Sequence, residues 1–276
     1  MSRTIRFLAI AMVATVFAPV ADVDAALTPG ALHDYDAGNN PLAASDQWQN
    51  NGSLGGMATA FGGPPVLTVG DPTYYSRPNG GAFGNLATAT QWVDFSAEIW
   101  VRRTGNAGSE HQIFGVSGVG GVPRIQVYTS VFGNADDMDV ILRGTGAGSS
   151  GVNMTDAVPA ALPLDQFVQY VFTWNNTSKD FTIYRDGNNV AFSQNLPTLI
   201  TSLGADAWVE LFKANVNEGD ARGFNGDISR FRFYNVALTG QQVQDNFNFG
   251  NAVPEPSSLA LAVCGLMGVA LWRRRK

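Results

Sequence analysis

The sequence has very few of the residues on which several classes of protein depend. Its 276 residues include one cysteine, two histidines and three lysines, and only 14% of them are charged. A single cysteine forms no internal disulfide, and the lack of a Cys-x-x-Cys pair excludes the common zinc and iron–sulfur motifs. The scarcity of lysine and the low pI of about 4.8 argue against a protein that binds nucleic acid through its phosphates. Heptad repeats are missing too, which excludes a long coiled coil.

Glycine and apolar residues dominate instead, with 31 glycines and a hydrophobic fraction of 45%. This composition is typical of a β protein with many tight turns. The net charge of −6 hides an uneven distribution, because six basic residues lie near the two ends. These six bases and three of the acids lie outside residues 26–252. The residues from 26 to 252 therefore contain 11 bases and 20 acids and carry a formal charge of −9. The basic ends therefore belong to membrane processing, and the acidic middle is the folded domain.

The first 25 residues have the three parts of a secretory signal peptide. A basic start at 1–6 precedes an apolar run at 7–20 and the small-residue exit Val23-Asp24-Ala25. The run of about 14 residues is too short for a membrane span, which takes about 20. We therefore predict a signal peptide at 1–25, cleaved after Ala25, and export of the chain.

The other end, residues 253–276, has a comparable order of features. Pro254, Glu255 and Pro256 form a short extended motif, because each proline restricts its own backbone and that of the preceding residue. Residues 259–272 then carry no charge, and the chain closes on Arg273, Arg274, Arg275 and Lys276. A helix of this apolar segment is roughly 21–24 Å long, short for a permanent span, and the basic tail would stay in the cytoplasm.

These features resemble the PEP-CTERM sorting signal of Gram-negative bacteria. In that family an exosortase, a multi-spanning membrane protease, recognises the Pro-Glu-Pro motif and releases the protein outward, and the host usually makes extracellular polysaccharide. The resemblance implies export across the inner membrane, transient anchoring there through the C-terminal helix, and a final place at the cell surface or outside the cell. An ordinary tail anchor that is never removed is the alternative.

Between these ends, residues 26–252 alternate in polarity with the period of two that is typical of β-strands. In residues 91–103, Phe95, Ala97, Ile99 and Val101 share one face, and the opposite face carries Ser96, Glu98, Trp100 and Arg102. The same alternation or apolar content predicts further strands at 123–132, 138–143, 167–174, 181–185, 190–193, 207–213 and 228–235. Many short strands with Gly-rich turns favour an all-β sandwich over a parallel α/β sheet.

Two local signals add detail to this prediction. Asp186-Gly187 lies between two apolar runs and predicts a hairpin turn, since glycine tolerates a positive φ. Thr239 and Gln242 have the spacing of a capping box, and Val243 and Phe247 follow one turn apart. A short helix therefore closes the domain just before the C-terminal segment.

Three segments resemble the laminin-G-like, concanavalin A-type domains: residues 95–101, the hairpin region 169–187, and the closing strand 226–238 with the helix after it. The resemblance implies a concanavalin A-like/laminin-G-like β-sandwich (jelly roll) with a short C-terminal helix over residues 26–252. Val168-Gln169 departs from the family, which usually has a His-His pair there, so no binding role is carried over to these positions.

Catalytic patterns are weak. The glucanase branch of this fold carries Glu-x-Asp-x-x-Glu on one strand, whereas Glu218 and Asp220 are followed by Gly223 at the third position. Glu98 shares a strand face with Arg102, and we expect these two to form an ion pair. Neither His33 nor His111 comes with a nucleophile motif, and no Gly-x-Ser-x-Gly elbow is present. We therefore expect a protein that is not an enzyme.

Binding of calcium or of sugar is a better match to the residues present. Three carboxylates within four residues, Asp136, Asp137 and Asp139, offer the oxygens that calcium prefers, although a solvated turn has the same composition. The resemblance to laminin-G-like domains implies a second candidate ligand, Asp227 after Gly226, at the position of an aspartate on the rim of those domains. Sugars need exposed aromatic rings beside polar groups, and Gly/Asn/Pro-rich segments contain four such rings: Trp48, Tyr74, Tyr75 and Trp92. Trp100 and Trp174 are expected in the core.

The function predicted from these features is an exported, non-enzymatic binding or scaffolding domain that associates with extracellular polysaccharide or a surface protein. The alternatives are a purely structural matrix protein without glycan binding and a glycan-active hydrolase or lyase of the same fold. The motifs predict the fold and the cellular location of the protein. They do not predict its ligand, because one fold hosts many activities.

Overall fold

The computed structural model describes residues 27–40, 46–77, 82–88, 93–105, 111–117, 123–129, 137–144, 151–197, 199, 207–213 and 223–251. Residues Thr28–Asn248 form one compact unit. The predicted signal peptide at 1–25 and the predicted sorting segment at 253–276 lie outside the described residues. Among the helical residues that are described, no helix is long and apolar enough to span a membrane.

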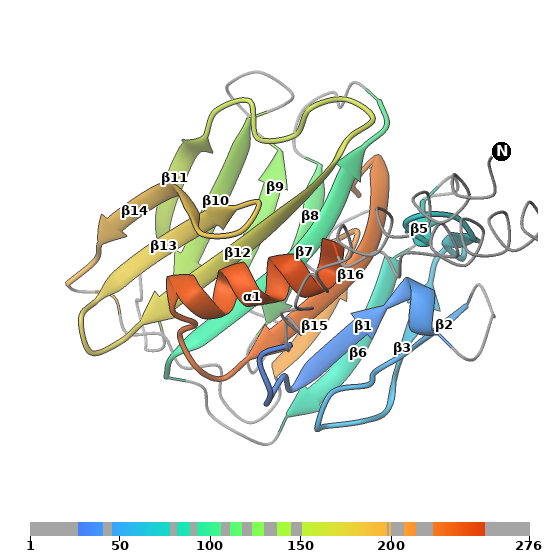
Figure 1. The fold of residues 1–276 in the computed structure, drawn as a ribbon, viewed down its shortest axis with the longest axis horizontal. Helices are drawn as coiled ribbons and strands as arrows, with labels where there is room; N and C mark the ends of the chain where they lie inside the picture. Colours follow the sequence, from blue (N-terminus) through green and yellow to red (C-terminus); the bar gives the residue numbers. More distant parts are fainter. Residues whose placement is uncertain are drawn as a thin grey trace, which may run out of the picture. The chain divides into compact units, whose positions relative to one another are not determined.

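Two eight-stranded sheets, here called sheet A and sheet B, make up this unit (Figure 1). Sheet A has the order β14 (Asn189–Asn195), β13 (Asp180–Arg185), β12 (Phe167–Asn175), β7 (Phe95–Arg103), β16 (Gly226–Tyr234), β5 (Tyr74–Ser76) and β4 (Val66–Thr68), and β1 (His33–Asp36) pairs with β16. Sheet B has the order β11 (Gly151–Val158), β10 (Met138–Arg143), β9 (Pro123–Thr129), β8 (Gln112–Ser117), β15 (Ala207–Leu211), β6 (Ala82–Thr88), β3 (Met57–Phe61) and β2 (Gln47–Gln49). The all-β sandwich predicted from the alternating sequence is confirmed.

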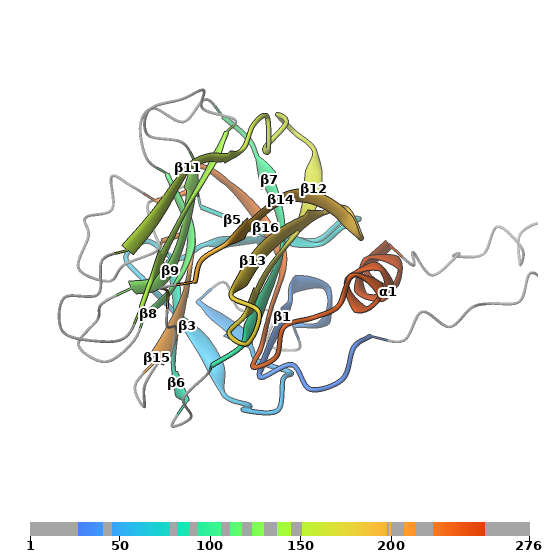
Figure 2. The ribbon, with the colours of Figure 1, turned by 90° about the vertical axis from the view of Figure 1, so that its left-hand side faces the viewer.

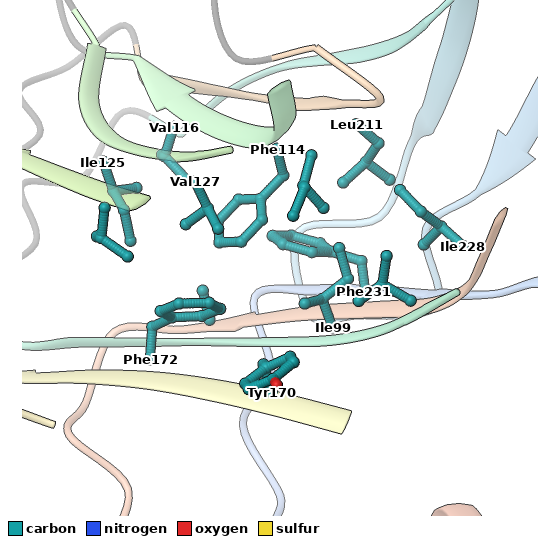
Figure 3. Close-up of a cluster of buried hydrophobic side chains, with 14 of the residues drawn as sticks. Ile99, Phe114, Val116, Ile125, Val127, Tyr170, Phe172, Leu211, Ile228 and Phe231 are labelled. Carbon is teal, nitrogen blue, oxygen red and sulfur yellow. The ribbon is translucent and has the colours of Figure 1, made fainter. Parts of the chain in front are cut away.

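The core lies between the two sheets and is filled by the apolar half of each alternating strand (Figure 3). Phe114 of sheet B contacts Phe172 and Phe231 of sheet A, with ring centroids 5.4 and 5.2 Å apart. Phe95, Ala97, Ile99 and Val101 of β7 all belong to this core, as their period of two predicts. Each such aromatic side chain contributes about 1.5–3 kcal/mol to folding by its burial.

The helix α1 (Gly240–Asn251) packs on the side of sheet A that faces away from sheet B, so that sheet A lies between sheet B and the helix (Figure 2). It begins with the predicted capping box: the Thr239 backbone N–H donates to Gln242 Oε1 at 2.9 Å, and the Gln242 N–H donates to Thr239 Oγ1 at 3.3 Å. Val243 is buried, and Phe247 stacks on Trp100 with centroids 5.6 Å apart. The helix thereby covers part of the outer face of sheet A.

The predicted hairpin turn at Asp186-Gly187 joins β13 to β14, and both residues have a positive φ, 47° and 89°. The positive φ favours glycine at the second position, and a Cβ at 187 would approach Gln244 Oε1 of α1 to 2.6 Å, so that the Gln244 side chain would have to move. The Gly187 N–H donates to the side chain of Gln169 at 3.1 Å. The turn therefore lies directly against the helix, with Gly187 next to Gln244.

The strands between residues 47 and 88 were not expected, because we interpreted this Gly/Asn/Pro-rich region as loops. It contains β2, β3, β4, β5 and β6, and no strand was predicted for β8 and β11 either. Several of these strands are only three residues long, too short for an alternating pattern to stand out. The short 3-10 turn Ala37–Asn39 follows β1.

Candidate functional site

The strand register of sheet B places one residue from each of seven strands in a single line across the outer face of this sheet. The neighbouring members, in the order β3, β6, β15, β8, β9, β10 and β11, are Thr59, Gly84, Glu210, Gly115, Gln126, Ile141 and Asn153. Adjacent residues on the same strands, such as Val209 and Leu211, point into the core. We call these seven residues the Glu210 row.

Glu210 lies between two residues without side chains, Gly84 on β6 and Gly115 on β8. Neighbouring strands are about 4.8 Å apart, so the two glycines are the residues directly beside Glu210 on either side, and neither contributes a side chain of its own. A Cβ at position 84 would approach Cε1 of Phe61 to 3.1 Å, so the nearby ring also favours glycine there. The Glu210 side chain is 1% exposed, whereas the two ends of the row, Thr59 and Asn153, are exposed.

Planar polar groups continue the row beyond Gly115. Arg143 donates through Nη1 to Oε1 of Gln126, which joins a guanidinium on β10 to an amide on β9. A second, shorter line on the same face places the half-buried Tyr128 between Gln112 and Asp139. A carboxylate accepts hydrogen bonds, a guanidinium donates them and an amide does both, and this combination is what a ligand rich in hydroxyl groups requires.

Two of the four predicted sugar-binding aromatics prove to be core residues, and the prediction of an exposed surface is wrong for them. Trp48 and Tyr75 are both fully buried, with ring centroids 4.7 Å apart. Each occupies the inward position of a short strand, β2 or β5, so their apolar area fills the space between the sheets. Trp92 lies outside the described residues.

Tyr74 is half-buried on the outer face of sheet A, and there the sugar-binding assignment stays a prediction. The Arg102 guanidinium lies 4.5 Å from the centroid of its ring. Trp100 and Trp174, expected in the core, are buried.

The calcium prediction also stays a prediction. Asp136 lies outside the described residues, Asp137 accepts a hydrogen bond from the Ala160 N–H at 2.7 Å, and Asp139 is on the outer face of sheet B. The second candidate, Asp227, is engaged by Arg102, whose Nε donates to it at 2.8 Å. Within the part of the chain that the structure describes, no three His, Cys, Asp or Glu side chains gather closely enough to hold a metal ion.

Glu98 pairs with a different arginine from the one expected. Arg102 bonds to Asp227, and Glu98 instead lies 3.3 Å from Nη1 of Arg232. The reason is that Arg232 comes from the adjacent strand β16 at the position directly opposite Glu98, which a sequence pattern within β7 does not reveal. The prediction of a structural role without catalysis is consistent with this pair, whose side chains are 0% and 1% exposed.

Three further groups donate to the Glu98 carboxylate beneath α1: Trp100 Nε1 at 3.1 Å, Gln169 Nε2 at 2.9 Å and Asn246 Nδ2 at 2.9 Å. Burial alone would raise the pKa of Glu98, but the Arg232 charge and the hydrogen bonds from Gln169 and Trp100 hold this pKa below its usual value. Arg232 also bonds to Asp34 at 3.0 Å. We call Glu98, Arg232, Asp34 and the three donors the Glu98 network.

The two histidines have no catalytic surroundings among the described residues. His33 is fully buried beside Tyr35 and Phe233, and its burial lowers its pKa to about 4. His111 Nδ1 lies 2.7 Å from the carbonyl oxygen of Gly223. Glu218 and Asp220, the partial glucanase pattern, lie outside the described residues, as do Pro254, Glu255, Pro256 and the tail Arg273, Arg274, Arg275 and Lys276.

Sequence reasoning did not find the Glu210 row. Glu210 and Gln126 occur in segments that were predicted as strands, whereas Gly84 and Gly115 lie in segments for which no strand was predicted. Only the register of three strand pairs in sheet B brings the glutamate, the two glycines and the amide into line.

Comparison with known families assigns the class of this protein. Residues 79–244 match the concanavalin A-like lectin/glucanases superfamily, and the chain belongs to that superfamily. Residues 252–276 match the PEP-CTERM protein-sorting motif, which implies export, processing by an exosortase-type membrane protein and a place at the cell surface or outside the cell. Both resemblances stated from the sequence are thereby confirmed. Among curated proteins, none matches this sequence.

Solved structures with a similar fold include two sugar complexes. The ligand-binding domain of botulinum neurotoxin serotype D, in complex with N-acetylneuraminic acid, is 12% identical with a TM-score of 0.55, over 79% of this chain and 50% of that chain. Domain 4 of AbnA, a GH43 extracellular arabinanase from Geobacillus stearothermophilus, in complex with arabinotriose, is 19% identical with a TM-score of 0.55, over 78% and 97%. This chain thus spans about half the length of the neurotoxin domain. At such identities the likeness shows the fold alone.

Proposed function

We propose that this protein is an exported, non-enzymatic domain that binds extracellular polysaccharide through the outer face of sheet B. The observation that carries the proposal is the Glu210 row, in which a carboxylate lies between Gly84 and Gly115 and is followed by the Gln126–Arg143 pair. The helix α1 packs on the outer face of sheet A and not on that of sheet B (Figure 2).

The chemistry of the row suits hydroxyl groups, each of which both donates and accepts a hydrogen bond. Glu210 accepts, Arg143 donates, and the Gln126 amide does both. The half-buried Tyr128 adds an aromatic ring on the same face. Two fold neighbours are crystallised with N-acetylneuraminic acid and with arabinotriose, which supports a sugar as the class of ligand for this chain.

Binding without catalysis is supported by the spacing of the acids on this face. Glu210 on β15 and Asp139 on β10 are three strands apart, which is roughly 14 Å across a sheet. Glycoside hydrolysis with two carboxyl groups needs a separation of about 5–9.5 Å. Among the described acids of this face, these two are therefore too far apart to work as a catalytic pair.

The test is a glycan-array screen of residues 26–252, which contain the whole compact unit, in calcium and again in chelator. We expect binding that falls roughly tenfold to hundredfold in Glu210→Gln and in Gln126→Ala, because each removes a hydrogen bond to ligand. Gln194→Ala, an exposed amide on the edge strand β14, is the matched control and should bind like the parent.

Each other outcome selects an alternative. Binding that disappears in chelator would place calcium in the site and direct attention to Asp136, Asp137 and Asp139. Self-association without binding to any glycan would contradict the proposal and favour a structural matrix protein. Release of reducing ends from a bound polymer would show a hydrolase.

A further inference from the structure

A second group of aromatic and charged side chains lies on the opposite side of the sandwich, on the outer face of sheet A. The register brings Phe167 of β12, Arg102 of β7 and Asp227 of β16 side by side, and Tyr74 of β5 joins them. The Arg102 guanidinium lies 4.5 Å from the Tyr74 ring centroid and 4.7 Å from that of Phe167, and the two centroids are 5.7 Å apart. We call these four residues the Arg102 cluster.

The cluster is held firmly in place but is not covered. Asp227 accepts from Arg102 Nε at 2.8 Å and lies 2.7 Å from Nη2. The Arg102 side chain nevertheless keeps 23% of its surface exposed, and both rings are only half-buried. Two residues earlier on the same face of β7, Trp100 is covered by Phe247 of α1. The Arg102 cluster therefore begins where the cover of the helix ends.

Apolar surface borders the cluster on two sides. Leu164, which precedes β12, is 49% exposed, and Val66 of the edge strand β4 is 42% exposed. Val66 continues the same line across the sheet, since it pairs with Ser76 and Ser76 pairs with Asp227. A sugar offers an apolar C–H face and hydroxyl groups on its rim. The aromatic rings and exposed aliphatic groups match the apolar face, and the planar guanidinium with its carboxylate acceptor matches the hydroxyl groups.

The charges of the cluster select among sugars. Arg102 is balanced by Asp227, whose pKa is raised mainly by burial and further by the negative charge of the nearby Asp165. The whole of residues 26–252 carries a formal −9. The negative charge near the cluster and the net negative charge of the whole domain would both repel an acidic polysaccharide. A neutral polysaccharide would not be repelled.

We propose that the Arg102 cluster is a second glycan site, specific for neutral saccharides, and that the two sites on opposite faces let one domain bridge two polysaccharide chains. Bridging rests on the proposed function, because one of its two contacts is the Glu210 row. Two separate sites on one rigid domain raise avidity and cross-link polymers without any new contact between protein molecules. The domain would then work as a cross-linker of extracellular polysaccharide.

The experiment measures cross-linking and single-site binding separately. Light scattering follows the size of complexes between the full-length mature protein and three neutral polymers, an α-glucan, a β-glucan and an arabinan, with alginate as the acidic control. Calorimetry with a tetrasaccharide of the bound polymer counts the sites. We expect two sites per chain, cross-linking with at least one neutral polymer, and none with alginate.

Single substitutions test whether the Arg102 cluster forms the second glycan site. Arg102→Lys keeps the charge but loses the planar group that lies over both rings, and Phe167→Leu keeps apolar volume but loses a ring. Each should leave one oligosaccharide site and raise the protein concentration needed for cross-linking at least tenfold. Phe192→Leu makes the same change at a half-buried ring of β14 in the same sheet and should behave like the parent. Thermal unfolding confirms that each variant is folded.

The results separate the two proposals. A single oligosaccharide site that Glu210→Gln removes, with no cross-linking by the parent, would overturn the second site and leave the proposed function standing. If cross-linking were unchanged in both Arg102→Lys and Phe167→Leu, the proposal of a second site would also be overturned. No binding of any neutral polymer by the parent would overturn the second site, and the proposed function would fall as well if the glycan array also showed no binding. Strong cross-linking of alginate would overturn the specificity for neutral chains.

Discussion

The outer faces of the two sheets surround a buried carboxylate in different ways. Beneath α1, the Glu98 carboxylate receives four donors, and its partner Arg232 also bonds to Asp34. On sheet B, Glu210 lies between two glycines on a face that the helix does not cover. Both carboxylates are buried, but the first lies beneath a helix and the second lies on a sheet face on which the helix does not pack.

From this difference we infer that one face of the molecule mainly stabilises the fold and the other mainly binds ligand. Asn246 illustrates the covered side: its Nδ2 donates to Glu98 at 2.9 Å and to Tyr234 at 3.0 Å, and its Oδ1 accepts from the Thr28 N–H at 2.9 Å. One amide thus joins the N-terminal segment, the helix and the centre of sheet A. We expect changes in the Glu98 network to affect folding, and changes in the Glu210 row to affect ligand affinity.

The largest expected effect is that of Glu98→Ala. It leaves the Arg232 guanidinium buried beside three unsatisfied donors, and the loss of one partner of a buried pair costs about 3–5 kcal/mol. Urea unfolding of the mature domain measures this cost. The double variant Glu98→Leu/Arg232→Met is the control and should lose less than Glu98→Ala. A loss below about 1 kcal/mol in Glu98→Ala would contradict the assigned role of the network.

An intermediate effect is expected from pH, through His33. Burial lowers its pKa to about 4, so the folded state keeps the ring neutral while the unfolded chain binds a proton below pH 6.5. The unfolded state then holds more protons between these values, and stability falls as the pH falls. The loss should reach roughly 2 kcal/mol between pH 6.5 and 5.

Urea unfolding at several pH values tests this, with His33→Phe as the variant that no longer titrates. The difference between the two pH profiles isolates His33 from the carboxylates. Parallel profiles over this range would contradict the lowered pKa.

The smallest effect sharpens the comparison between the two faces. Thr239→Ala removes the capping hydrogen bond to the Gln242 N–H and should cost about 1 kcal/mol of stability. Since α1 covers sheet A alone, the affinity of the Glu210 row for a glycan should not change. Thr239→Ser should restore the lost stability. A fall in glycan affinity equal to that of Glu210→Gln would show that the two faces are coupled.

Much of the fold was predictable because local patterns and burial agree in the longer strands. The alternation in residues 95–102, the Asp186-Gly187 turn and the Thr239–Gln242 capping box depend on neighbours within a few residues, and each is found as predicted. The short strands β2, β4 and β5 were missed because three residues hold too little pattern. Their aromatic residues Trp48 and Tyr75 were for this reason assigned to a surface.

The sequence by itself determined the class of fold, the C-terminal helix and the sorting motif, because these depend on residues close together in the chain. The tertiary structure alone decided the partners across strands: that Glu98 meets Arg232, that Arg102 meets Asp227, and that Glu210 lies between Gly84 and Gly115. The physical reason is strand register. A shift of one residue in pairing reverses which face each side chain occupies, and the chain determines that register only when both sheets close over a common core.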